Sequence, residues 1–287
     1  WNSGTMSGTG TTTIASGGTL GLSGTNPRTL SRLLVNDGAT TWTGGAIQMA
    51  GGTFTNNGAF TASTASTLDS SGFNVGSVNA FNNMGSFLKQ GGGTVRFNVI
   101  NTPVAFNNSG TVEIQQGNLQ LLGGGAHTGD FNVAAGTTLQ LSGVHSFAAS
   151  SDLTGAGTIY LAGGSATFGG QLSPTGVVTI ALGGTATINS ATSLGGLNLS
   201  SGTFNGAGNV TLSGSSVWSS GVMSGSGATT IGVGGTLSLT GGGSQYQGFN
   251  RAITNNGATS WTGQGQGISF LGGTFQNNGT FTANYGA

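Results

Sequence analysis

The chain of 287 residues contains no cysteine and very few charged residues. Without cysteine it can form neither disulfides nor thiolate metal sites. Five Lys and Arg side chains balance five Asp and Glu side chains, so no basic patch favours nucleic acid. No stretch approaches the roughly 20 apolar residues of a membrane helix. We therefore expect no nucleic-acid partner, no membrane insertion and no cofactor.

Glycine is abundant, with 60 residues, and hydrophobic residues make up 35% of the chain. That apolar content is too high and too evenly spread for a disordered Gly/Ser linker. The apolar residues alternate with polar ones, as in Leu119-Gln120-Leu121 and Val178-Thr179-Ile180, which is typical of half-buried strands. Glycine interrupts every run before a helix can nucleate. The sequence predicts an all-β fold.

A long segment of the chain occurs twice. Residues Trp1 to Leu22 recur as Trp218 to Leu239, and Trp42 recurs as Trp261. The whole of residues 1–62 is repeated as 218–283, which gives a tandem unit of about 217 to 221 residues. A long tandem unit is typical of a repeat array. We therefore expect residues 1–287 to form one continuous domain.

A shorter period lies inside the long unit. Apolar doublets separated by 19 or 20 residues begin at Leu119, Leu139, Ile159, Val178, Leu197, Val217 and Leu237. This spacing predicts a parallel β-helix, or β-solenoid, with coils of about 20 residues, in which each strand pairs with its equivalent one coil further on. The long unit would then hold about 11 coils and the chain roughly 14.

The corners between strands are rich in Asn and Gly. Examples are Asn56-Asn57-Gly58, Asn82-Asn83-Met84-Gly85 and Asn107-Asn108-Ser109-Gly110. Asn-Gly pairs favour positive φ, and stacked Asn side chains can hydrogen-bond from coil to coil. We expect the excess residues around 25–33 and 62–72 to form side loops.

The runs from Asn107 to Leu121, from Gly155 to Ile159 and from Ser200 to Phe204 resemble repeats of very large exported bacterial β-helix proteins. They are similar in style to filamentous-haemagglutinin-type adhesins and autotransporter passenger domains, and the resemblance covers essentially the whole chain. It implies a right-handed β-helix at the cell surface or in the extracellular matrix. The handedness is not visible in the residues themselves.

Catalytic and metal-binding residues are hard to find. A polysaccharide-degrading β-helix enzyme would need clustered carboxylates, whereas the five acids are spread from Asp37 to Asp152. His127 and His145 lie 18 residues apart and could stack and hold a metal with Asp130. We favour the alternative that both histidines are exposed loop residues, and we expect no catalytic or metal site.

Sugar contacts are the other candidate chemistry. Trp42, Trp261 and Tyr246 could serve as aromatic platforms for glycans, although recurrence with the repeat favours core packing for the Trp residues. Side loops at 24–34 and 240–249 would display such contacts. Four Asn-X-Ser/Thr sequons are candidates for glycosylation: Asn107, Asn198, Asn209 and Asn278.

Together these features predict a structural segment of an extracellular bacterial filament or adhesin stalk, without catalytic activity. Its partners would be further copies stacked end to end, with surface glycans as possible ligands. The alternatives are a carbohydrate-binding surface adhesin and, less favoured, a polysaccharide-degrading enzyme. With so few ionisable groups, we expect thermal stability to be nearly flat from about pH 4 to pH 9.

Overall fold

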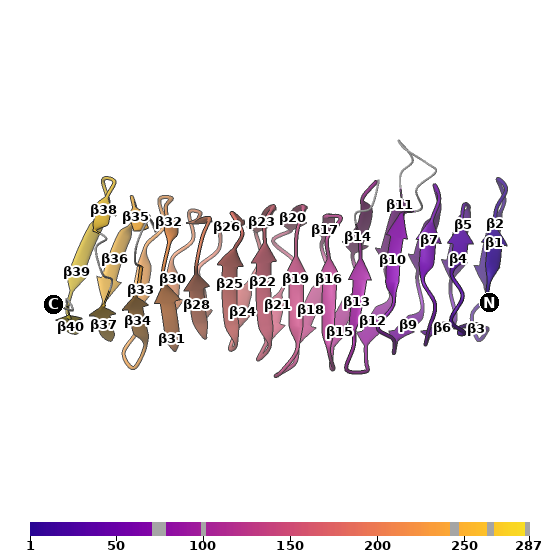
Figure 1. Cartoon of the computed structure of the whole chain (residues 1–287), viewed down its shortest axis with the longest axis horizontal. Helices are drawn as coiled ribbons and strands as arrows, with labels where there is room; N and C mark the ends of the chain where they lie inside the picture. Colours follow the sequence, from indigo (N-terminus) through magenta and orange to yellow (C-terminus); the bar gives the residue numbers. More distant parts are fainter. Residues whose placement is uncertain (71–78, 99–101, 242–246, 263–266, 285–287) are drawn as a thin grey trace.

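The computed structural model describes residues 1–70, 79–98, 102–241, 247–262 and 267–284. Over these ranges the chain is all-β and forms a β-solenoid of about 13 turns. The turns stack into a rod with the two termini at opposite ends (Figure 1). No helix in the described ranges is long and apolar enough to cross a membrane. The predicted all-β solenoid is confirmed.

Each turn carries three short strands, one on each of three faces. Sheet A comprises β1(Gly4–Met6), β4(Arg28–Leu30), β7(Ile47–Met49), β10(Thr67–Ser70), β13(Thr94–Phe97), β16(Asn118–Leu121), β19(Thr138–Leu141), β22(Thr158–Ala162), β25(Val177–Ala181), β28(Gly196–Leu199), β31(Ser215–Trp218), β34(Thr236–Leu239), β37(Ala258–Trp261) and β40(Thr280–Ala283). Sheet B comprises β2(Thr11–Ile14), β5(Leu33–Asn36), β8(Thr53–Asn56), β11(Asn79–Asn83), β14(Val104–Asn108), β17(Gly125–His127), β20(Val144–Phe147), β23(Ser165–Phe168), β26(Thr185–Ile188), β29(Thr203–Asn205), β32(Gly221–Met223), β35(Gln247–Phe249) and β38(Ile268–Phe270).

The third face is made of two sheets that follow one another along the rod. Sheet C comprises β3(Thr19–Leu22), β6(Ala39–Trp42), β9(Ala59–Ala62), β12(Ser86–Lys89), β15(Thr111–Ile114), β18(Asp130–Val133), β21(Leu153–Gly155) and β24(Leu172–Pro174). Sheet D continues it with β27(Thr192–Leu194), β30(Val210–Leu212), β33(Thr229–Ile231), β36(Ala252–Asn255) and β39(Thr274–Asn277). The change of sheet falls at Pro174, which has no backbone N–H to donate to the ladder.

All pairings between the described strands are parallel, and each strand pairs with the strand three places further along the chain, except at the break between β24 and β27. The predicted doublets Leu119, Leu139 and Ile159 are successive partners. The turns are not uniform, however, because Asn56 and Asn83 occupy neighbouring turns although they are 27 residues apart. Longer turns in this region explain why the solenoid has about 13 turns rather than the predicted 14.

The prediction that Val217 begins an inward doublet is wrong. Val217 pairs with Asn198 on the outward row, whereas Trp218 pairs with Leu199 on the inward row. The inward position before Trp218 is Ser216, which is 1% exposed and accepts a hydrogen bond from the backbone N of Leu197 at 3.0 Å. Since side chains alternate between the two faces of a strand, a shift of one residue reverses inside and outside.

Glycine at the Asn-rich corners is required by crowding rather than by positive φ. None of the corner residues Gly58, Gly85 and Gly110 has a positive φ. A Cβ atom on Gly85 would lie 2.1 Å from the carbonyl oxygen of Gly58, and one on Gly110 would lie 1.9 Å from that of Gly85. The backbones of neighbouring turns therefore approach too closely at this corner for any side chain.

The predicted asparagine ladder is present and lies inside the solenoid. Nδ2 of Asn36 donates to Oδ1 of Asn56 at 2.7 Å, Asn56 donates to Asn83 at 2.8 Å, and Asn83 donates to Asn108 at 2.7 Å. All four side chains are at most 1% exposed. The second hydrogen of each Nδ2 goes to a carbonyl of the next turn, such as that of Thr111 for Asn83. Buried amides are tolerated because they are paired.

Aromatic rings form matching columns beside this ladder. The ring of Phe81 is stacked between Phe54 and Phe106, with centroids 5.1 and 5.4 Å away, and Phe60 is stacked on Phe87 at 5.4 Å. The two columns meet edge to face, as between Phe60 and Phe81 at 5.1 Å. Stacked and edge-to-face pairs add roughly 0.5–1.5 kcal/mol each beyond area burial. The two columns thus form part of one continuous hydrophobic core along the axis of the solenoid.

The two copies of the duplicated segment lie on different faces. Strand β1 corresponds in sequence to β32, β2 to β33 and β3 to β34. Sheet A is thereby matched to sheet B, sheet B to sheet D, and sheet C to sheet A. The step is 31 strands, which at three strands per turn is about ten and one-third turns. Each tandem unit is therefore rotated by one face about the axis, and the predicted 11 coils per unit are too many.

Candidate functional site

The predicted aromatic platforms have different environments. Trp42 is fully buried, and its ring meets Phe60 edge to face at 6.4 Å, so it offers no face to a sugar. Trp261, its counterpart in the second copy, is half-buried at the C-terminal end of the rod. Tyr246 lies outside the described residues. The platform prediction for Trp42 is wrong because its ring is fully buried in the hydrophobic core.

The two predicted display loops are partly strand. The segment 24–34 contains β4, in which Arg28 and Leu30 are fully buried. The segment 240–249 ends in the buried strand β35, and residues 242–246 lie outside the described part. The side-loop prediction for residues 25–33 is therefore wrong for residues 28–30 and 33, which are strand, whereas residues 25–27 are exposed and lie outside any strand. In the segment 62–72, residues 67–70 form β10, and 71–72 are not described.

The four sequons divide into two pairs. Asn209 and Asn278 are exposed, whereas Asn107 and Asn198 are half-buried on the outward rows of strands. The amide of Asn107 is engaged, because its Nδ2 donates to Asn82 at 2.9 Å and its Oδ1 accepts from the backbone N of Ala126 at 3.0 Å. The exposed pair is thus the more accessible one.

The acidic residues whose side chains are described do not converge on one site. Asp130 and Asp152 lie on adjacent turns, but Asp130 accepts from the backbone N of Asp152 at 2.9 Å. Asp37 accepts from Asn57 at 2.7 Å, and Glu113 accepts from Gln115 at 3.0 Å. The described residues contain no group of three or more His, Cys, Asp and Glu that could hold a metal ion. Each acid serves to pair neighbouring backbone or amide groups.

His127 and His145 are stacked but buried, so the prediction that they are exposed loop residues is wrong. They are 1% and 2% exposed, with ring centroids 5.3 Å apart and nearly parallel planes. Nε2 of His127 lies 3.0 Å from Nδ1 of His145. Asp130, the third predicted metal ligand, is exposed on the outward row of β18. The pair therefore belongs to the core, where His127 follows Asn108, the last residue of the asparagine ladder, on the next turn.

Burial keeps both imidazoles neutral. Desolvation and the neighbouring His145 lower the pKa of His127 to about 3. Desolvation also lowers the pKa of His145, although its bonds to the carbonyls of Leu121 and Ser142 act in the opposite direction. A charge inside this apolar column would have no acidic partner among the groups packed against it.

Three cations are also buried, which the sequence analysis missed. Arg28, Lys89 and Arg251 are at most 2% exposed. Each is surrounded by backbone carbonyls at a corner of the solenoid; Nζ of Lys89, for example, donates to Gln90, Gly91 and Gln116 at 2.6–3.1 Å. Carbonyls at a sharp corner have no strand partner, and a cation can satisfy several at once. The sequence does not show which carbonyls lie at a corner without a partner, so the burial of these cations becomes apparent only in the tertiary structure.

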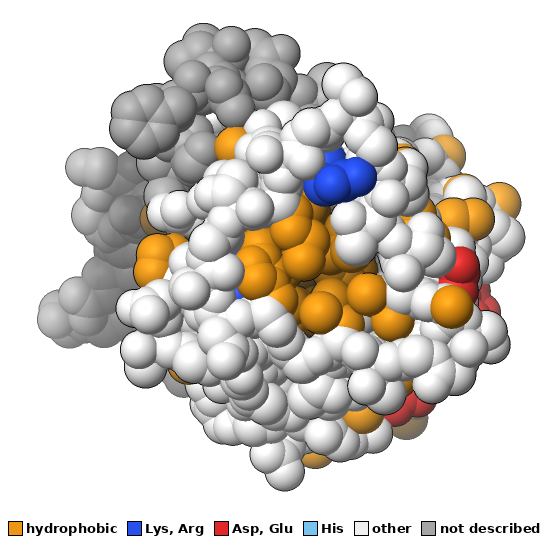
Figure 2. All heavy atoms as spheres, turned by 90° about the vertical axis from the view of Figure 1, so that its right-hand side faces the viewer, with side chains coloured by type: hydrophobic (Ala, Val, Ile, Leu, Met, Phe, Trp, Pro, Cys, Tyr) orange, Lys and Arg blue, Asp and Glu red, His pale blue; other side chains and the backbone are white. Residues whose placement is uncertain are grey.

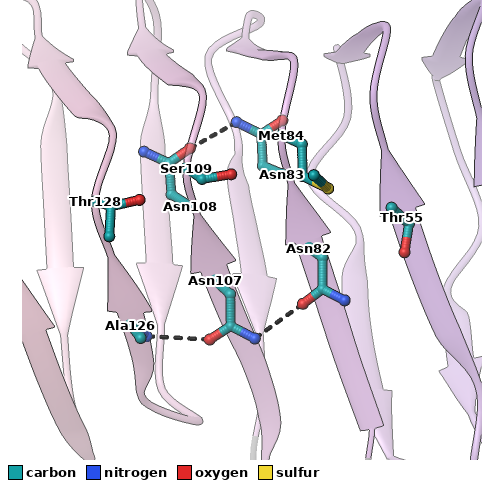
Figure 3. Close-up of a pocket in the computed structure, with 9 residues that line it drawn as sticks. All are labelled: Thr55, Asn82, Asn83, Met84, Asn107, Asn108, Ser109, Ala126 and Thr128. Atoms are coloured by element: carbon teal, nitrogen blue, oxygen red, sulfur yellow. Dashed lines mark hydrogen bonds between the residues drawn. The ribbon is translucent and has the colours of Figure 1, made fainter.

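A shallow polar groove runs over sheet B where the asparagine corners stack (Figure 3). Its outward row places Thr55, Asn82 and Asn107 on successive strands. Met84 stands at its rim with 59% of its surface exposed. Asn82 accepts from Asn107 through Oδ1, and its Nδ2 points toward the strand that carries Thr55 (Figure 3). The groove offers the Nδ2 donor of Asn82 and the apolar side chains of Met84 and Ala126, but no aromatic ring lines it.

The C-terminal end of the rod is a hollow apolar face. A cavity of about 240 Å³ there is lined by seven apolar residues: Leu239, Phe249, Trp261, Ile268, Phe270, Phe275 and Phe281. Phe270 is 62% exposed and Phe281 is 39% exposed. Their counterparts in the first copy, Met49 and Phe60, are at most 1% exposed because a further turn covers them. The same side chains are thus core or surface according to whether another turn follows.

The N-terminal end shows the same chemistry. Figure 2 looks onto this end, where apolar side chains fill the centre of the cross-section and a cationic side chain lies at its rim. Met6, Ile14 and Leu20 are only partly buried here. Among the described residues, β1 and β40 each pair on one side only, and apolar side chains lie at the centre of both end faces, which are the strongest candidate interaction surfaces.

Comparisons of this chain with protein-family models, with curated proteins and with solved structures found no match.

Proposed function

We propose that this chain is a structural segment of an extended bacterial filament or adhesin stalk outside the cell, in which stacked turns convert chain length into reach. No catalytic step is part of this role, and its partners are further copies of the same repeat. The observation that carries the proposal is the unbroken stack: sheet A joins 14 strands in parallel from β1 to β40. The asparagine ladder and ring columns tie successive turns together along the axis.

The duplicated segment supports this role because it makes equivalent contacts in both copies. Arg32 donates to the carbonyl of Ser7, and its counterpart Arg251 donates to the carbonyl of Ser224, which is the counterpart of Ser7. A unit that keeps its contacts at a new position along the rod, and on a new face, is suited to tandem extension. Stability then rises with the number of turns instead of with the size of a globular core.

Electron microscopy of chains carrying one, two and three copies of residues 1–217 tests the proposal. We expect straight rods that lengthen by about 50 Å for each added unit, since about ten and one-third turns rise by about 4.8 Å each. Beads joined by flexible links, or a length that does not grow with unit number, would contradict it. A chain of equal length with Gly85 and Gly110 replaced by Val, which disrupts the corner, serves as the control.

The groove over sheet B supports a second candidate, glycan binding. Its outward amides and the exposed Met84 would contact hydroxyls and an apolar sugar face. A glycan array probed with the chain and with an Asn82→Ala/Met84→Ser variant tests this candidate. Selective binding by the parent chain, lost in the variant, supports an adhesin; equal signals for both contradict binding at this groove.

A further inference from the structure

The duplication shows what covers the N-terminal face when a turn precedes it. Met6, Ile14 and Leu20 correspond to Met223, Ile231 and Leu237 in the second copy, which are at most 1% exposed. Those three residues pair with Phe204, Leu212 and Ser216 of the preceding turn. The chain therefore contains, at residues 200–217, the turn whose register and side chains fit its own N-terminal face.

A cation distinguishes this face from a plain apolar surface. Inside the chain, Nη1 of Arg251 donates to the carbonyl of Ser224 at 3.1 Å and Nη2 donates to that of Ala228 at 3.0 Å. The same Nη2 reaches past that turn to the carbonyl of Gly208 at 3.1 Å, and the guanidinium carbon lies 5.1 Å from the ring centroid of Phe204. One arginine thus links three consecutive turns.

Arg32 makes only the first part of this arrangement. It donates through Nε to the carbonyl of Gly10 at 2.9 Å and through Nη1 to that of Ser7 at 3.2 Å. Its side chain remains partly exposed, and its Nη2 lies over the Gly10 corner, on the side where a preceding turn would present the counterpart of Gly208. No carbonyl and no ring fill that position among the described residues.

We propose that the N-terminal face is a docking face for another copy of the turn at residues 200–217, and that Arg32 recognises this turn through a corner carbonyl and a phenylalanine ring. The inference rests on the proposed stacking function and names its partner. The apolar centre supplies most of the affinity, because Met6, Ile14 and Leu20 are partly exposed here and become buried when a turn covers them. Arg32 determines the register of the docked turn, because its guanidinium reaches a carbonyl oxygen of that turn only when the corner equivalent to Gly208 lies next to it.

The test places residues 200–217 directly before Trp1, so that Val217 precedes Trp1 as it precedes Trp218 in the natural chain. We expect the melting temperature to rise by several degrees and amide exchange in β1 and β2 to slow by at least about tenfold, given the apolar burial. The matched control carries the same extension with Phe204→Ser and Leu212→Ser. If the two extensions give equal melting temperatures and equal exchange, the proposal is overturned.

Arg32 is tested separately in the extended and the parent chain. We expect Arg32→Ala to remove a substantial part of the extension's protection of β1 and β2, and Arg32→Lys to restore part of it. If Arg32→Ala lowers the melting temperature equally in both chains, the proposed recognition role is wrong, because its bonds to Ser7 and Gly10 exist in both. These outcomes are independent of rod length in microscopy, so failed docking and a failed filament proposal are distinguishable.

Discussion

Nε2 of His127 lies 3.0 Å from Nδ1 of His145, and the far side of His145 determines which ring holds the proton between them. Nε2 of His145 faces two carbonyl oxygens, those of Leu121 at 3.1 Å and Ser142 at 2.9 Å, and must therefore carry a hydrogen. In the neutral ring Nδ1 is then an acceptor, so His127 donates. This leaves Nδ1 of His127 buried without a partner, and protonating either ring would place a charge in the core.

The histidine pair makes stability depend on pH, in contrast to the flat profile expected from the composition. Because burial lowers the pKa of His127 to about 3, the unfolded chain binds a proton below about pH 6.5 that the folded chain does not. The free energy of unfolding should therefore fall by about 1.4 kcal/mol per pH unit for this group between pH 6 and pH 4, and remain level above pH 7. Urea unfolding across pH 4–8 measures the slope.

His127→Asn provides the matched variant for this pH effect. Asn108 pairs in register with His127, so an asparagine there would extend the ladder and would not titrate. We expect the acid slope to decrease in the variant. A slope equal to that of the parent chain would mean that other groups cause the acid sensitivity.

Replacing any inner asparagine of the ladder should lower the free energy of unfolding. Asn83→Leu removes the acceptor of Asn56 and the donor of Asn108, and leaves both amides buried. We expect a loss of roughly 2–6 kcal/mol in the free energy of unfolding, at 1–3 kcal/mol for each of the two unsatisfied buried groups. Asn82→Ala, on the outward row of the same strand, should cost less than about 1 kcal/mol. Similar losses for both variants would contradict the role of the ladder.

Crowding at the glycine corner predicts a large effect of a single methyl group. A Cβ on Gly85 would lie 2.1 Å from the backbone oxygen of Gly58, and backbone cannot move aside as a side chain could. Gly85→Ala should therefore destabilise the solenoid by roughly 3 kcal/mol. Gly92→Ala is the control, because nothing lies within 4 Å of its added Cβ. Equal melting temperatures for the two variants would contradict this prediction, because they would show that the backbone at the corner can move to accommodate the added Cβ.

Leu182 is the one described residue other than glycine with positive φ, at 54°, and it is 73% exposed. The left-handed conformation costs an ordinary residue roughly 1–2 kcal/mol, and asparagine tolerates it better. Leu182→Asn should accordingly stabilise the chain by about 1 kcal/mol. Val233→Asn, at an even more exposed position with ordinary φ, should leave stability within about 0.5 kcal/mol. A stabilisation common to both variants would point to surface polarity instead of backbone strain.

Patterns with a short period were readable from the sequence because they arise from local rules. Alternation in Leu119-Gln120-Leu121 indicated a strand with one buried face, and the recurrence of that pattern about 20 residues later indicated stacking. The Asn-rich corners likewise indicated a ladder. Each of these features depends on the strand period and on one repeat length, so no knowledge of distant contacts was needed.

Features that depend on how turns meet were decided only by the tertiary structure. The inward position of Trp218 in place of Val217 follows from a register shift of one residue, which the spacing of doublets does not fix. The burial of His127 and Lys89 follows from which corner carbonyls and rings surround them, and these come from residues a full turn or more away. The sequence by itself determined that the chain stacks turns. The rotation of the tandem unit by one face required the tertiary structure, because it depends on the summed length of unequal turns.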